Sequence, residues 1–304
     1  MPYTGKDKVN KPVILVSDVA GKKVTVKQTA AQCHCLLYLM PLMIGDKFPP
    51  NNAKWELYVQ FLDVLDFILA PELDRGQLLH FSQLLEEFLR EFYSVYENIH
   101  IKPKGHFMLH YPKQYETFGP LIHNCTLRFE GKHSYFKGIM KKTKNFKSPC
   151  YTMATRHQYM QCWHHQAQNY LSGVNSKYTI KIPEGAVEFS ILKFLMQNYP
   201  NQKWNLYKKV SHQGVTYSQG HAFLIKSDEK LFAKQLCVTA INGKLTFIVT
   251  YFKTLTFDEN FHSYIVSETE NLAFIYLEDL QTHIPMPVYE ICGEKMIILP
   301  HFVK

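Results

Sequence analysis

The stretch QLCVTAINGKLTFIVTYF, residues 235–252, decides the fold of the C-terminal third of the chain. Apolar residues alternate with polar ones on both sides of Asn242-Gly243, and this dipeptide between two alternating runs indicates a β-hairpin with a two-residue turn. Short runs of the same kind recur after Lys203, namely VTYS, HAFLI, SYIV, PVYEI and KMIILPHF. We therefore expect residues 204–304 to form a small antiparallel β-barrel or a twisted antiparallel sheet.

The first half of the chain has the apolar periodicity of helices instead. A first helix is expected within residues 29–44, followed by a stop at the glycine and prolines after it. Asn51 or Asn52 can cap a second helix, and Asp74 can cap a third that runs through Val95. The predicted buried stripe of the second helix is Trp55, Val59, Leu62, Leu65 and Leu69.

These patterns predict an α+β protein. We expect an N-terminal arm over 1–28, an all-helical region over 29–168, a linker over 169–203 and the β-rich domain over 204–304. The run VILVSDVAGKKVTV within the arm fits either two short strands or an extended segment. In the helical region, Gly119-Pro120 and Ser148-Pro149 are expected to separate one helix from the next.

Charge is distributed unevenly along the helical region. Residues 54–97 carry nine Asp or Glu against three Lys or Arg, whereas residues 102–165 carry eleven Lys or Arg against two Glu. The whole chain has a formal charge of +8, which by itself is common in proteins that bind nothing acidic. The concentration of positive charge in one segment is therefore more informative than the total.

Composition excludes several classes of protein. No stretch approaches the roughly 18 uninterrupted apolar residues of a membrane helix, so no membrane partner is expected. The first residues lack the apolar region of a secretory signal, which favours a nuclear or cytoplasmic location. The seven cysteines are odd in number and widely spaced, so we expect reduced thiols and not a disulfide framework.

The basic segment is the predicted nucleic-acid interface. Its lysines can neutralise phosphates, and its aromatic side chains can stack on unpaired bases. The alternative is a solvated basic face whose aromatic residues point into the core. DNA is the expected partner, and RNA is the alternative nucleic acid. The predicted contact residues are Lys132, Tyr135, Lys137, Lys141, Lys142, Lys144 and Lys147.

A metal site has only weak candidates. His106 and His110 are four residues apart, a spacing that places two imidazoles on one face of a helix. Cys125, His123 or His133 could complete such a site, but no CxxC or HExxH pattern supports it, and paired histidines also serve as packing or hydrogen-bonding groups. We therefore expect no bound metal.

Three segments carry a resemblance to a known family. They are QTAAQCHCLLYLMPLMIGDKFP at 28–49, KPKGHFMLHYPKQYETFGPLIHNCTLRFEGKHSYFKGIMKKTKNFKSP at 102–149, and TRHQYMQ at 155–161. Together with HSYIV and the ending PMPVYEICGEKMIILPHF, they resemble the C-terminal half of animal proteins derived from DNA transposons. Those proteins are similar to the transposases of the CACTA group.

The resemblance implies an RNase H-like fold in which three carboxylates hold two Mg²⁺ ions. By that likeness, residues 29–98 correspond to a helical insertion and Glu130 to the last catalytic acid, while the two aspartates would lie before Met1. One carboxylate cannot hold the metal pair, so Mg²⁺ is expected only where a complete site is assembled. Alternatively, Glu130 pairs with Arg128, Lys132 or His133 in a surface ion pair.

Three interpretations follow for function. The first is a transposon-derived nucleic-acid-binding protein that is catalytically incomplete. The second is a subunit of a metal-dependent transposase or nuclease, completed by an N-terminal transposase piece. The third is a protein-interaction or self-associating module in which the acidic helices pair with the basic segment and DNA is not bound. The residues leave the ligand of the β-rich domain open.

Overall fold

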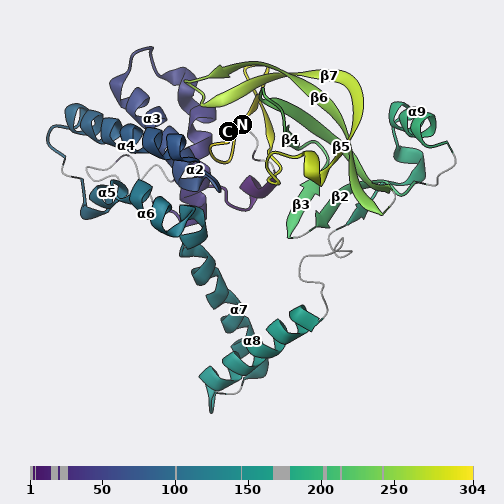
Figure 1. The fold of residues 1–304 in the computed structure, drawn as a ribbon, viewed down its shortest axis with the longest axis horizontal. Helices are drawn as coiled ribbons and strands as arrows, with labels where there is room; N and C mark the ends of the chain where they lie inside the picture. Colours follow the sequence, from purple (N-terminus) through teal and green to yellow (C-terminus); the bar gives the residue numbers. More distant parts are fainter. Residues whose placement is uncertain are drawn as a thin grey trace.

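The computed structural model describes residues 3, 5–14, 20, 27–99, 101–144, 146–166, 179–200, 204–212, 214–241 and 243–303, apart from the side chains of 5, 6, 127–130, 164, 166 and 184. Most of the strand pair or arm expected over 13–26 lies outside these residues. The architecture is α+β, with helices in the first half of the chain and one curled antiparallel sheet in the second (Figure 1). The predicted fold class is confirmed.

The first three long helices begin where the sequence predicts. Thr29 and Gln32 form a capping box at the start of α2 (Ala30–Ile44), and Asp74 and Gln77 form another at the start of α4 (Arg75–Val95). Of the two candidate caps for α3 (Ala53–Leu69), Asn52 is the one used, and its side chain accepts a hydrogen bond from the Trp55 amide at 3.1 Å. Side-chain oxygens thus satisfy amide groups that a helix start leaves without partners.

The buried face of α3 differs from the predicted stripe. Trp55 and Leu62 are buried as expected, but the three other predicted positions are only half-buried. Leu57, Val64 and Phe67 are buried as well, and they share a core cluster with Phe81 and Leu85 of α4. The helix is therefore covered on more than one side, because α4 packs on one face and other parts of the protein cover the face that holds Trp55.

The basic segment divides into two structurally different parts. Residues 101–125 form α5 (Pro103–Met108), α6 (Tyr111–Phe118) and the short 3-10 turn η3 (Leu121–Asn124), which lie against the α3–α4 hairpin. Tyr115 is buried in the same core cluster as α3 and α4. Apolar contacts therefore hold this part of the basic segment on the acidic helices.

The second part is a helical hairpin that leaves the body of the protein. It consists of α7 (Leu127–Thr143) and α8 (Pro149–Gln166), and Figure 1 shows it extending away from both the other helices and the sheet. The breaks predicted at Gly119-Pro120 and Ser148-Pro149 are both confirmed, since α6 ends before the first and α8 starts at the second.

The sheet is antiparallel throughout, with the strand order β1-β2-β5-β6-β7-β9-β8, while β3 pairs with β2 and β4 pairs with β5. Ile241 pairs with Lys244 across the predicted hairpin turn, where Gly243 has φ of 77°. The runs PVYEI and KMIILPHF also pair, as β8 and β9, through a turn at Cys292 and Gly293. The strands are β1 (Ile180–Lys181), β2 (Tyr207–His212), β3 (Val215–Ser218), β4 (Ala222–Ile225), β5 (Leu231–Ile241), β6 (Lys244–Asp258), β7 (Ser263–Tyr276), β8 (Val288–Ile291) and β9 (Glu294–Ile297).

Part of the expected linker belongs to the sheet's own core. Within the described residues of 169–203, β1 pairs with β2, and α9 (Phe189–Asn198) follows it. Ile191 and Leu195 of α9 are buried in one cluster with Cys237 of β5 and Ile248 of β6. The packed β-rich unit therefore begins before residue 204.

An apolar seam joins the helical half to the sheet. Leu39 and Leu42 of α2 are buried with Tyr289 of β8 and Met296 of β9. Near the C-terminus, Phe302 stacks on Phe67 of α3 with ring centroids 4.4 Å apart. Because side chains from both halves share these contacts, the helices and the sheet form one continuous body.

A polar network crosses the same seam. His262, in the turn between β6 and β7, is buried, and its Nε2 lies 3.1 Å from Oδ2 of Asp66. Tyr38 of α2 donates a hydrogen bond to the other oxygen of Asp66 at 2.8 Å. Asp63, one turn earlier on α3, lies 3.7 Å from Nδ1 of His262. Asp66 thus connects α2, α3 and the sheet.

Two further properties of the described residues bear on the class of protein. No helix among them combines the length and apolar character needed to cross a membrane. All seven cysteines lie in the described part of the chain, and each is a free thiol.

The seam predicts a specific dependence of stability on pH. Burial raises the pKa of Asp63 above its ordinary value of 3.8, and the neighbouring carboxylates of Asp66 and Glu259 add to the rise while His262 opposes it. The fold therefore favours the protonated form of Asp63, and its ionisation costs stability as the pH rises above 3.8. We expect Asp63→Asn to gain stability relative to the wild type in urea unfolding as the pH rises from 3.8 through the raised pKa of Asp63.

Asp66→Asn is the matched control one turn along α3. It weakens the contacts of Asp66 with Tyr38 and His262, so we expect a loss of roughly 1 to 3 kcal/mol in the free energy of unfolding at neutral pH. Equal destabilisation by both variants across the whole pH range would contradict the role assigned to Asp63.

Candidate nucleic-acid interface

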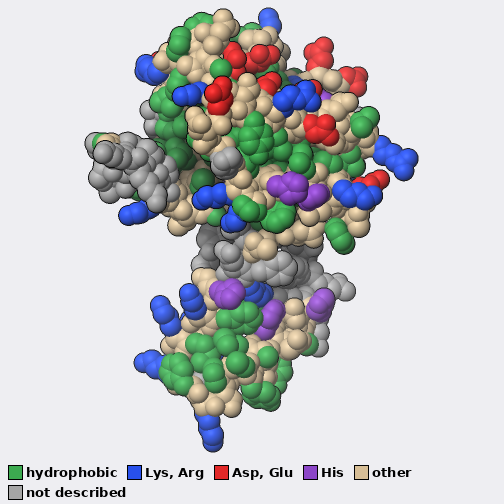
Figure 2. All heavy atoms as spheres, turned by 90° about the vertical axis from the view of Figure 1, so that its left-hand side faces the viewer, with side chains coloured by type: hydrophobic (Ala, Val, Ile, Leu, Met, Phe, Trp, Pro, Cys, Tyr) green, Lys and Arg blue, Asp and Glu red, His purple; other side chains and the backbone are tan. Residues whose placement is uncertain are grey.

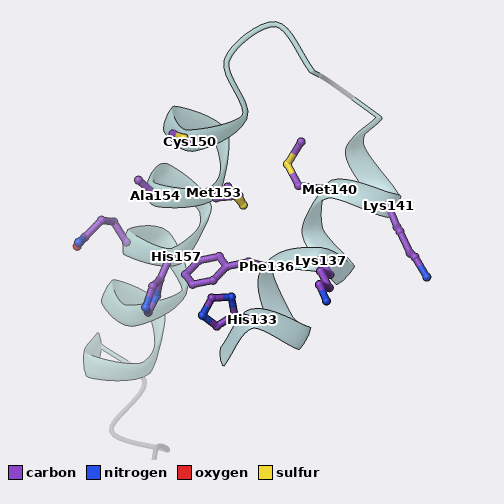
Figure 3. Close-up of a pocket in the computed structure, with 10 residues that line it drawn as sticks. His133, Phe136, Lys137, Met140, Lys141, Cys150, Met153, Ala154 and His157 are labelled. Atoms are coloured by element: carbon purple, nitrogen blue, oxygen red, sulfur yellow. The ribbon is translucent and has the colours of Figure 1, made fainter. Parts of the chain in front are cut away.

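The two helices of the α7–α8 hairpin pack through a small apolar face. Phe136 and Met140 of α7 point toward α8, and Met153 of α8 points back toward α7 (Figure 3). Among the described side chains of α7, Ile139 is the buried one, with 8% of its surface exposed. Phe136 also contacts the imidazole of His157, at 5.6 Å between ring centroids. These contacts join the two helices of the hairpin.

Local sequence sets the turn between the two helices. Lys144 ends α7 in the left-handed conformation, with φ of 50°, and its amide bonds to the carbonyl of Met140. The carbonyl of Ser148 accepts the amide of Thr152 at 3.0 Å, and proline at the first position of α8 needs no amide partner. The connection between the two helices is therefore short, since α7 ends at Thr143 and α8 begins at Pro149.

A pocket of about 730 Å³ lies between the two helices. Its walls are mainly apolar, with histidines and lysines at the rim, as Figure 3 shows. The lining residues are His133, Phe136, Lys137, Met140, Lys141, Cys150, Met153, Ala154, His157 and Gln158.

The predicted lysines follow α7 and its tip, but they do not share one narrow face. Lys137 and Lys141 border the pocket, whereas Lys142 is turned from Lys141 by about 100° around the helix. Lys144 and Lys147 lie at the tip. All five are exposed. The positive charge therefore surrounds the outer part of α7 and is not confined to a flat strip.

Carboxylates do not neutralise this charge in the part of the chain that the structure describes. The sequence contains no Asp or Glu from residue 131 to residue 183, and residues 131–166 contain seven Lys or Arg. No described carboxylate forms an ion pair with Lys137, Lys141, Lys142 or Lys144. Positive charge is therefore concentrated on the hairpin, whereas the rest of the protein carries both positive and negative side chains.

Tyr135 and Lys132 have structural contacts that the sequence did not indicate. The ammonium group of Lys132 lies 5.0 Å from the centre of the Tyr135 ring. Tyr135 also packs edge-on against His157, at 5.9 Å between ring centroids. Both residues are half-buried, so Tyr135 is less available to a base than the prediction assumed.

The most exposed aromatic side chains of the hairpin lie elsewhere. Phe146 at the tip is 71% exposed, and on α8 Tyr151 is 73%, Tyr159 71% and Trp163 61% exposed. The sequence prediction missed the three α8 residues because their run has no clear apolar periodicity. Their spacing of eight and four residues is the signal that could have identified a shared face.

The two candidate metal ligands, His106 and His110, lie side by side. The rings of His106 and His110 meet edge-on, with centroids 5.2 Å apart, and both are exposed. Helix α5 ends at Met108, so the pair does not sit on one continuous helix. Among the described residues, no group of three or more His, Cys, Asp or Glu could hold a metal ion.

The role suggested for Glu130 stays a prediction. Its backbone lies in the first turn of α7, but its side chain is outside what the structure describes. The described residues between 30 and 166 form helices and turns without a β-strand, so they contain no strand of an RNase H-like sheet.

Loss of the exposed lysines is expected to leave the fold intact. We predict that the quadruple variant Lys137→Gln, Lys141→Gln, Lys142→Gln and Lys144→Gln changes the free energy of unfolding by less than about 0.5 kcal/mol, because exposed side chains without ion pairs contribute little to stability. Urea unfolding at low salt measures this free energy. At low salt the variant has less repulsion between like charges, so any change should be in its favour. A loss above about 1 kcal/mol would mean that these lysines have partners within the protein.

Comparisons of this chain with models of protein families, with curated proteins and with solved structures found no match. The resemblance to transposases of the CACTA group therefore stays a prediction. The case for a nucleic-acid interface rests on the charge, exposure and placement of the α7–α8 hairpin.

Proposed function

We propose that this protein binds nucleic acid through the α7–α8 hairpin, with DNA as the principal ligand and RNA as the alternative. The observation that carries the proposal is the charge of the hairpin, which has seven Lys or Arg and no Asp or Glu over residues 131–166. A phosphate backbone is the polyanion that such a surface attracts most generally, because each neutralised phosphate releases condensed counterions.

The placement of the hairpin supports this proposal. Nine acidic residues lie on or next to α3 and α4, within residues 54–97, and the hairpin extends away from these two helices (Figure 1). In Figure 2, Asp and Glu side chains appear on the upper body, while the lower lobe formed by the hairpin shows Lys, Arg and His. A nucleic acid can therefore approach the lysines without also approaching that group of carboxylates, which would repel it.

A transposon origin is the proposed background to this activity. It follows from the segments at 28–49, 102–149 and 155–161, which resemble transposases of the CACTA group. On that proposal, Glu130 would be the last of three catalytic acids, and the other two would come from another polypeptide. Binding of DNA, and not its cleavage, is then the activity expected of this chain alone.

The salt dependence of binding tests the proposal. If the hairpin contacts five or six phosphates, the logarithm of the association constant for duplex DNA should fall with the logarithm of salt concentration with a slope of about −4 to −6. The quadruple lysine-to-glutamine variant should reduce the magnitude of that slope by about 3 to 4, in a fluorescence anisotropy titration over several salt concentrations.

A second quadruple variant provides the charge-matched control. Lys181, Lys193, Lys208 and Lys253 are exposed on the sheet and on α9, and their replacement by glutamine makes the same change in net charge. We expect this control to keep nearly all of the wild-type slope. A slope near zero for the wild type, or equal losses in both variants, would contradict binding through the hairpin.

A further inference from the structure

The outer face of α8 carries a row of exposed aromatic side chains. Tyr151, Tyr159 and Trp163 are separated by eight and four residues, which places them within about 120° of one another around a helix of 3.6 residues per turn. Met153 and His157, which face α7, lie on the other side of α8. The aromatic row is therefore directed away from the contact that holds the hairpin together.

Positive charge borders this row. Arg156 falls between Tyr151 and Tyr159 in the sequence and lies about 20° beyond Trp163 around the helix, at the edge of the sector that holds the row, and it is exposed. Phe146, also exposed, lies beside Lys144 and Lys147 at the tip. Figure 2 shows hydrophobic side chains across the middle of the lower lobe and Lys or Arg side chains along its edge and at its lowest point.

We propose that the aromatic row of α8 stacks on the unpaired bases of a single-stranded nucleic acid while the lysines of α7 and the tip bind its phosphates. This inference rests on the proposed function and names its substrate class. A single strand offers both anionic phosphates and exposed aromatic bases, which match the two kinds of side chain on the hairpin. A duplex offers the phosphates, but its bases are already stacked and paired.

Charge favours this ligand over a protein surface. A second copy of the chain would bring another hairpin, with seven Lys or Arg and no Asp or Glu over residues 131–166, against the first, so like charges would oppose the contact. An apolar patch surrounded by cations needs a partner that is both anionic and rich in flat apolar groups. An unpaired nucleic acid has both properties along its whole length.

The natural fluorescence of the protein gives a direct measurement. The chain has three tryptophans, of which Trp55 is 5% exposed, Trp204 is half-buried and Trp163 is 61% exposed. We expect a thymidine oligonucleotide of about 16 residues to quench Trp163 and to bind at least about tenfold more tightly than a duplex of equal length at the same salt concentration. Trp163→Phe assigns the signal, since it should remove the quenching and retain most of the affinity.

Aromatic variants separate stacking from charge. The double variant Tyr151→Ser and Tyr159→Ser should lose about tenfold in single-strand affinity for each residue, because stacking contributes strongly per base. Its affinity for the duplex and its salt slope should stay unchanged, since no cation is removed. Phe189→Ser on α9, which removes an aromatic residue that is 80% exposed, should change neither affinity.

The outcomes distinguish this inference from the proposed function. Duplex binding as tight as single-strand binding, with no effect of the tyrosine variants, overturns the inference and leaves the proposed function standing. Failure to bind either nucleic acid overturns both. If vesicles of anionic lipid shift the Trp163 emission while oligonucleotides do not, or if the tyrosine variants only abolish a dimer in sedimentation, the aromatic row serves another partner and the inference is wrong.

Discussion

The apolar seam between α2, α3 and the sheet is the contact on which the rest of the structure depends. Leu39 and Leu42 are buried against β8 and β9. At the same boundary, the carboxylate of Asp66 accepts a hydrogen bond from Tyr38 and contacts the imidazole of His262. With the acidic helices fixed to the sheet in this way, α5 and α6 cover part of their apolar surface. The α7–α8 hairpin is then left outside the common core, and its cations face solvent. If the acidic helices packed against this hairpin instead, their carboxylates would neutralise its lysines, and the lysines could not bind an anionic ligand.

The elements that the sequence predicted are those set by local chemistry. Capping side chains such as Thr29 and Asp74 satisfy amides within their own first turn, and glycine at a two-residue turn adopts a positive φ wherever the strands lie. The buried stripe of α3 was predicted incompletely because burial depends on neighbours, and this helix has neighbours on more than one side. Likewise, the polar linker shows weak helical character over residues 187–196, which α9 confirms, but its place in the core depends on the contacts of Ile191 and Leu195 with β5 and β6.

The same distinction applies to the candidate site. Charge could be read from composition, because seven cations without an acid cannot be neutralised locally. Which aromatic residues face solvent could not be read, because it depends on how α8 is turned toward α7. Tyr135, predicted as a contact residue, lies against Lys132 and His157, whereas Tyr151 and Tyr159 face outward. The apolar contacts inside the hairpin thus decide which rings remain available to a base.

Lysine reactivity tests the central claim most directly. Acetylation of the intact protein, followed residue by residue with mass spectrometry, compares each ammonium group with and without a saturating oligonucleotide. The account predicts protection at Lys137, Lys141, Lys142 and Lys144, and unchanged reactivity at Lys181, Lys193, Lys208 and Lys253. Protection concentrated on the sheet, with the hairpin lysines as reactive in the complex as in the free protein, would contradict it.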